Sequence, residues 1–166
     1  FNAFFDQTSS YERKRFHNRH DLLKIALFDV WLANDDRTQG NPNLLVTADP
    51  EGHTIRVMDH EGIFHGNNPG RELPMLTMDD SILAHPAIRT LLGPRFKKSE
   101  FAARLEQEFY LCVEDCQQRT DEILASLPAD WQVPIATFGP LVKQQLFAKD
   151  RPKAVFHHFA SLLNHV

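Results

Sequence analysis

Two acids and an amide near the start of the chain could together hold a divalent cation and accept a proton. Asp36 and Asn41 lie five residues apart in a polar loop, and Asp59 ends the second of two short apolar runs that follow. An aspartate in a loop can accept the proton of an attacking hydroxyl group, and Mg²⁺ prefers oxygen ligands such as amides and carboxylates. The three residues therefore predict magnesium-assisted transfer of a phosphoryl group, which depends on positioning and on neutralising charge.

Other interpretations are open at and around these positions. Asp35 lies six residues before Asn41 rather than five, and it is the second candidate for the proton acceptor. Asp and Asn also favour turns for local reasons, so residue type alone does not establish a site. Asp29, inside the preceding apolar segment, is expected to be a structural acid, because a buried carboxylate needs hydrogen-bond partners.

A buried helix and a β-hairpin are expected to position these groups. Residues 22–33 are apolar on nearly all faces, which predicts a buried helix capped by Asp21. A glycine and a proline then prevent the helix from continuing into the polar loop. Residues 44–47 and 54–58 read as two strands joined by a turn-rich connection.

The rest of the chain reads mostly as helix. Residues 65–80 show no period and predict a loop, and a short helix follows and ends at Gly93. A long helix is expected to open at Ser99, with two more beginning near Pro134 and Pro152. The buried stripe of the long helix that opens at Ser99 is predicted to contain Phe101, Leu105, Phe109, Cys112 and Cys116.

These elements predict a mainly α fold with a small β-hairpin (α+β). We expect a single domain over residues 1–166. Within it, residues 1–20 form an N-terminal segment with a helix starting near Tyr11, residues 21–64 the catalytic helix, loop and hairpin, and residues 65–166 a helical part.

The composition is that of an ordinary globular chain, long enough to bury a core. The formal net charge of −4 gives no indication of a nucleic-acid-binding surface. No apolar run reaches the roughly 18 residues that suggest a membrane span, so we expect neither nucleic acid nor membrane as a partner. Two cysteines give no disulfide framework, which favours a reducing, cytoplasmic compartment.

The sequence FDVWLANDDRTQGNPNLL followed by IRVMDHEGIF resembles the HipA-like kinase family. The resemblance is to the branch whose loop reads Asn-x-Asp-Arg-x-x-x-Asn-Pro-Asn-Leu and whose metal motif begins Ile/Met-Asp-His. It covers residues 28–45 and 55–64, with a weaker match at residues 127–131. The resemblance implies the C-terminal lobe of a protein-kinase-like fold, with ATP and Mg²⁺ as cofactors.

The resemblance also implies a role for each polar residue. Asp36 would be the catalytic base, and Asn41 and Asp59 would bind magnesium. Arg37 would order the loop or lie near a phosphate. His60 takes the position of Phe in the Asp-Phe-Gly motif of ordinary kinases and would lie beside the cofactor.

Three further positions belong to the same comparison. Asn34 and Asn43 would hold the loop in shape. Glu61 stands where the family often has glycine, which puts the backbone after the metal motif in question.

The sequence departs from a complete kinase in one respect. No glycine-rich phosphate loop precedes the helix, and neither Lys14 nor Lys24 lies on a plausible strand. We therefore expect that the N-terminal lobe is absent from these 166 residues. The chain alone is expected to bind ATP weakly, without micromolar affinity, and to turn over negligibly.

The family resemblance implies a serine/threonine protein kinase whose substrate is another protein or the kinase itself. Some HipA-like kinases act as toxins paired with an antitoxin, so an antitoxin or other regulatory partner is expected here. A small-molecule or lipid hydroxyl acceptor is also open, because fold does not fix function.

Two other classes compete with the kinase interpretation. The chain could be a pseudokinase or interaction module without catalysis. It could also be a metal-dependent hydrolase, because it holds nine histidines, among them His17 and His20, and His60 and His65 near Asp59. No H-E-x-x-H motif or zinc-type cysteine pair supports this class.

Two remaining features have structural and binding interpretations. Cys112 and Cys116 continue an apolar stripe and are expected to be buried core thiols. Residues 11–20 are strongly basic, which favours a solvated helix face, with a phosphate or acidic-partner contact as the alternative.

Overall fold

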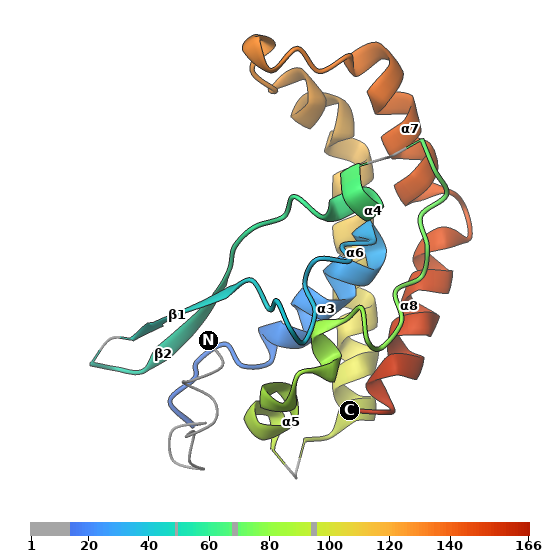
Figure 1. Ribbon diagram of the computed structural model, residues 1–166. Coiled ribbons are helices and arrows are strands. Elements are labelled where there is room, and N and C mark those ends of the chain that lie inside the picture. Colours follow the sequence, from blue (N-terminus) through green and yellow to red (C-terminus); the bar gives the residue numbers. More distant parts are fainter. Residues whose placement is uncertain (1–13, 49, 68–69, 94–95) are drawn as a thin grey trace.

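The computed structural model describes residues 14–48, 50–67, 70–93 and 96–166 (Figure 1). Its elements confirm a mainly α fold with a small β-hairpin. The predicted helix near Tyr11 begins outside the described residues. In chain order the elements are α3 (Asp21–Leu32), β1 (Leu44–Ala48), β2 (His53–Val57), α4 (Ile63–Asn67), η1 (Ile82–Ala84), α5 (Pro86–Leu92), α6 (Lys98–Ala125), η2 (Ala129–Trp131), α7 (Ile135–Phe147) and α8 (Arg151–Leu163).

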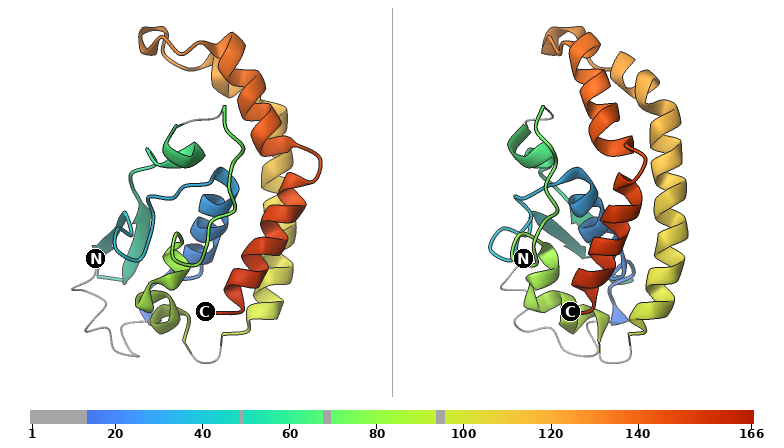
Figure 2. Two further views of the ribbon diagram at one scale, coloured as in Figure 1. Left: turned by 45° about the vertical axis from the view of Figure 1, so that its right-hand side comes forward. Right: turned by 90° about the vertical axis from the view of Figure 1, so that its right-hand side faces the viewer.

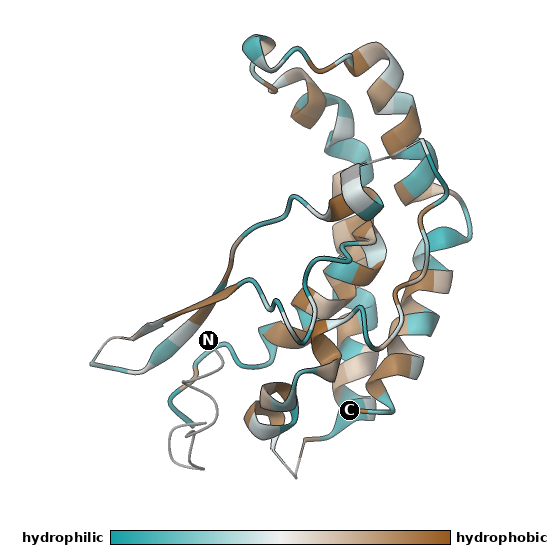
Figure 3. Ribbon diagram, viewed as in Figure 1, coloured by the Kyte–Doolittle hydropathy of each residue, from teal (hydrophilic) through white to brown (hydrophobic). Residues whose placement is uncertain are grey.

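The helices α3, α6, α7 and α8 form the main helical packing of the fold. Helices α7 and α8 pack along α6, and α3 packs against α8, as the views in Figures 1 and 2 show. Hydrophobic residues recur along each of these helices in Figure 3, as expected for amphipathic helices around a shared core. None of the described helices combines the length and apolar character needed to cross a bilayer.

The buried stripe of α6 departs from the predicted one after Phe109. Val113 is buried instead, while Cys112 is exposed and Cys116 is half-buried. The prediction of buried core thiols is therefore wrong for Cys112, whereas Cys116 is partly buried and packs against the core. The side chain four residues after Phe109 faces the core, and the one three residues after it lies at the edge of the stripe. Burial raises the pKa of Cys116 to about 11, so that thiol is uncharged at neutral pH.

Helix α3 is buried as predicted, but its first turn differs. His20 is the N-cap residue and no side chain caps the helix, so Asp21 is the first helical residue rather than the cap. An acid there still suits the positive end of the helix dipole. At the other end Ala33 has a left-handed φ of 50° and donates its N–H to the carbonyl of Asp29. This turn ends the helix and starts the polar loop.

The hairpin is antiparallel, and Leu44 pairs with Val57 and Ala48 with His53. The predicted strands are confirmed to within one residue at their ends. A segment from before α3 lies alongside β2, where the Asn18 side chain donates to the carbonyl of Ile55 and accepts from its N–H, both at 2.8 Å. These bonds attach the hairpin to the start of α3.

Candidate functional site

Arg37 is the fully buried centre of the loop, with 0% of its side chain exposed. Its Nε donates to Asp29 Oδ2 on α3 at 3.0 Å. The remaining guanidinium nitrogens donate to backbone carbonyls on both sides of the hairpin base, those of Pro42 (3.3 Å), Asn43 (2.7 Å), Met58 (3.1 Å) and Asp59 (3.2 Å). Of the two roles predicted for Arg37, this geometry fits loop ordering, because the buried guanidinium has protein partners throughout.

Asp29 is the structural acid that the sequence predicts, since it is buried and accepts from Arg37 and, at 2.8 Å, from Asn34. Burial raises the pKa of Asp29 to about 6, while Arg37 and Asn34 act in the opposite direction. The carboxylate is therefore ionised at neutral pH. It forms an ion pair that fixes the loop to the end of α3.

The carboxylate of Asp36 faces two amides of the same loop. Its Oδ1 accepts from Asn41 Nδ2 at 3.0 Å, and its Oδ2 accepts from Asn43 Nδ2 at 2.7 Å. Asn43 adopts a left-handed φ of 45°, a conformation that Asn tolerates better than most residues. The five-residue spacing thus brings an acid and an amide into contact at the surface of the loop.

Asp35 points to a different partner. Its Oδ2 lies 2.7 Å from His65 Nδ1 in α4. The α4 segment is a left-handed turn rather than a regular α-helix, because Phe64, His65 and Gly66 all have left-handed φ values. The structure therefore brings Asp36, and not Asp35, to the side chain of Asn41.

Asp59 lies two residues after the end of β2, and its backbone carbonyl accepts from Arg37. It has a left-handed φ of 55°, and its Oδ1 accepts from the N–H of Glu61 at 3.3 Å. The N–H of Met58 also donates to the carbonyl of Asn43 at 3.0 Å. The end of β2 is thereby joined to the end of the polar loop. It is at this junction that the predicted metal ligands would have to converge.

The oxygen donors at this junction suit a hard cation. Because the Asn41 amide nitrogen donates to Asp36, its carbonyl oxygen is the atom left for a metal. Mg²⁺ can be held by two protein ligands when phosphate and water supply the others. In the described part of the chain no three His, Cys, Asp or Glu side chains are grouped as they would be in a metal site.

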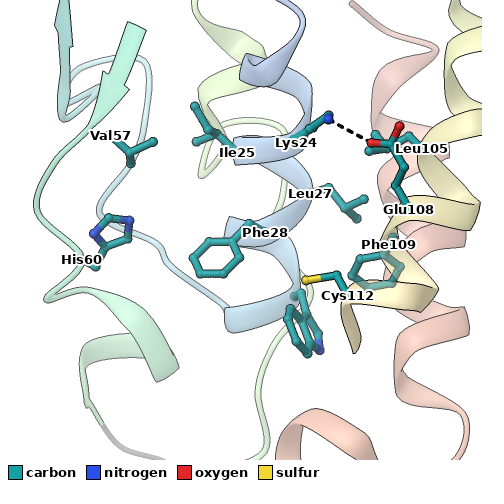
Figure 4. Close-up of a pocket in the computed structure, with 11 residues that line it drawn as sticks. Lys24, Ile25, Leu27, Phe28, Val57, His60, Leu105, Glu108, Phe109 and Cys112 are labelled. Carbon is teal, nitrogen blue, oxygen red and sulfur yellow. Dashed lines mark ion pairs between the residues drawn. The ribbon is translucent and has the colours of Figure 1, made fainter. Parts of the chain in front are cut away.

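His60 lies in an apolar groove of about 450 Å³ between the end of β2, α3 and α6 (Figure 4). Its ring meets Phe28 edge-on, with centroids 6.2 Å apart. Burial, and after it Arg37, lowers the pKa of His60, while Asp59 opposes the shift. The imidazole is therefore neutral at neutral pH and packs against α3. Its contact with a cofactor stays a prediction.

Gly62, three residues after Asp59, lies directly against the polar loop. A Cβ at this position would lie 2.6 Å from Asp36 Cβ and 2.8 Å from Asn34 Oδ1. Only glycine therefore fits at position 62 without displacing the loop. Asn34 Oδ1 is also buried, and it has no hydrogen-bond partner among the described residues.

Replacing Gly62 with alanine should lower the free energy of unfolding by about 1–3 kcal/mol, because overpacking displaces the loop. The matched control is Gly40→Ala, since a Cβ there would meet only Thr38 Oγ1 at 3.9 Å. Thermal unfolding followed by circular dichroism compares the two variants. Equal melting temperatures would show that Asp36 can move away from residue 62 at no cost.

A buried helix, a loop with an Asp–Asn contact and a hairpin that ends on a second Asp form the arrangement expected of a kinase-like phosphotransferase. A family model described as HipA-like kinase matches residues 7–147. The chain therefore belongs to the HipA-like kinase family. No curated protein and no solved structure shows a significant match to it.

Proposed function

We propose that this chain is the C-terminal lobe of a HipA-like kinase that transfers a phosphoryl group from ATP to a serine or threonine hydroxyl. The observation that carries the proposal is the contact between Asp36 and Asn41, joined through buried Arg37 to the backbone of Asp59. Asp36 would accept the hydroxyl proton. The carbonyl oxygen of Asn41 and the carboxylate of Asp59 would hold Mg²⁺, which neutralises phosphate charge when bound.

The outer face of the hairpin supports nucleotide binding beside this junction. Leu45 and Met58 are 50% and 52% exposed, although both are large apolar residues. Leu45 pairs with Arg56, and Met58 lies two residues further along the chain, so both side chains are on one face of the hairpin. This face also carries exposed Arg56, and its two apolar side chains would suit the flat base of a nucleotide whose phosphates reach the metal ligands.

The acceptor and partners belong to the same proposal. The acceptor hydroxyl would be on another protein or on the kinase itself, and an antitoxin or other regulatory protein would control the activity in the cytoplasm. The support for these assignments is membership of the HipA-like kinase family. A non-catalytic interaction module is the alternative that an experiment must separate.

Weak nucleotide binding can be tested by NMR with Mn²⁺ as a paramagnetic substitute for Mg²⁺. With ATP present, trace Mn²⁺ should broaden the amide signals of residues 36–43 and 59–62 before others, and calorimetry should give an affinity weaker than micromolar. Asp59→Asn should remove the broadening, because a neutral amide replaces the anionic ligand. The control is Asp130→Asn, which changes an exposed acid in η2.

Broadening that does not depend on ATP, or that survives Asp59→Asn, would contradict the assigned metal ligands. Failure of the unchanged chain to bind Mn²⁺ and ATP at millimolar concentrations would instead favour the interaction module. A micromolar affinity would overturn the expectation that the chain needs a further lobe to hold ATP.

A further inference from the structure

A second groove, lined in part by charged residues, lies at the opposite end of α3 from the Asp36 loop. It has a volume of about 370 Å³ and is formed by the residues before α3, the end of α5 and the first turns of α6. Helix α3 has 12 residues. At a rise of 1.5 Å per residue, it separates the groove from the loop by roughly 18 Å. The groove is therefore not part of the proposed phosphotransfer site.

Three aromatic rings form one wall of this groove. His20 lies 5.4 Å from Phe96 and 5.7 Å from Phe101, measured between ring centroids, and the two Phe rings are 5.4 Å apart. Burial lowers the pKa of His20, and the nearby charges of Arg19 and Arg104 lower it further. The imidazole is therefore neutral at neutral pH, and it adds to an apolar surface instead of a charged one.

Cations outnumber acids among the described residues that line the groove. Arg19, Lys97 and Arg104 line the groove, and Glu100 is the acid among its lining residues. Arg104 lies over the ring of Phe101, with 5.2 Å between its Cζ and the ring centroid, which holds the guanidinium at the groove.

Among the described residues, the acids that pair with Arg104 and Lys97 are weak competitors for an anionic ligand. Glu108 lies 3.8 Å from Arg104 but 2.9 Å from Lys24, so Lys24 is its closer partner. Lys97 pairs with Glu100 at 2.6 Å, but both side chains are more than half exposed. An exposed pair of this kind contributes little stability and can exchange its partner for a stronger anion.

We propose that this groove is a docking site for a phosphorylated peptide segment. The phosphate would meet Arg19, Arg104 and Lys97, and an apolar neighbour in the peptide would pack on the ring wall. A phosphate group carries nearly two negative charges and matches guanidinium geometry, so it complements a groove whose lining residues include three cations and one acid. The docking site would give a role to Arg19, which belongs to the basic segment before α3 and lies outside the phosphotransfer site.

Fluorescence anisotropy with a labelled peptide tests the proposal. The probe carries phosphoserine between leucine and phenylalanine, and its unphosphorylated form is the comparison. The phosphorylated form should bind at least about tenfold more tightly, and Arg19→Glu with Arg104→Glu should remove this preference. The charge-matched control is Lys149→Glu with Lys153→Glu, two exposed lysines outside the groove.

A gain-of-binding variant keeps the test independent of folding. Glu100→Gln removes the groove's own acid and should tighten binding of the phosphorylated probe several-fold. Equal binding of both peptides, tighter binding of a short single-stranded RNA, or no change in Glu100→Gln would overturn the proposal. Asp59→Asn should leave peptide binding unchanged, so failure of the docking site and failure of the ATP site are distinguishable.

Discussion

Replacing Arg37 with methionine is expected to lower the free energy of unfolding by about 3–5 kcal/mol, because it leaves the buried Asp29 carboxylate without its cationic partner. The same change removes the donors for the carbonyls of Asn43, Met58 and Asp59. A buried carbonyl that loses its donor adds to the cost of the missing charge. The variant should therefore be less stable, and its hairpin base should be less firmly attached to α3.

Urea unfolding followed by circular dichroism measures this effect. The control is Arg56→Met, which removes an exposed arginine of β2 and should change the free energy by less than about 0.5 kcal/mol. In the double variant Asp29→Asn with Arg37→Met, the loss should be smaller than the sum of the two single losses by at least about 1 kcal/mol. Additive losses would mean that Asp29 and Arg37 do not stabilise each other.

The sequence predicted the path of the chain around the site because the signals there are local. The apolar segment predicted α3, and the glycine and proline after it predicted the polar loop. Two short apolar runs joined by turn residues predicted the hairpin. Asp36 and Asn41, five residues apart, were predicted to belong to one site, and the structure brings them into hydrogen-bond contact. Such features depend on residues close together in the chain.

Features that depend on distant residues were not predictable in the same way. The burial of Arg37 follows from carbonyls that meet only when residues 42–43 and 58–59 are side by side. The need for glycine at position 62 arises because Asp36 lies directly against it. On α6, the choice of Val113 over Cys112 as the buried residue depends on how the neighbouring helices are placed against the stripe.

Replacing Asp36 with asparagine is expected to lower the rate of phosphotransfer in the intact protein by about 100-fold to 10,000-fold, the usual contribution of a general base. Asparagine has similar size but cannot accept the hydroxyl proton. It also offers one oxygen where Asn41 and Asn43 now donate to two, so one of these amides loses its partner. The effect should be mainly on the rate, with a smaller loss of stability.

Asp35→Asn is the matched control for this prediction, because it changes the adjacent acid in the same way. Asp35 interacts with His65 and not with Asn41, so its loss should change the phosphotransfer rate only a few-fold. Phosphate transfer is measured with radiolabelled ATP, and unfolding of each variant is measured in parallel. A greater loss in Asp35→Asn than in Asp36→Asn would make Asp35 the base. Unchanged transfer in both variants would exclude either acid from that role, and the Asp36–Asn41 contact would then serve only to shape the loop.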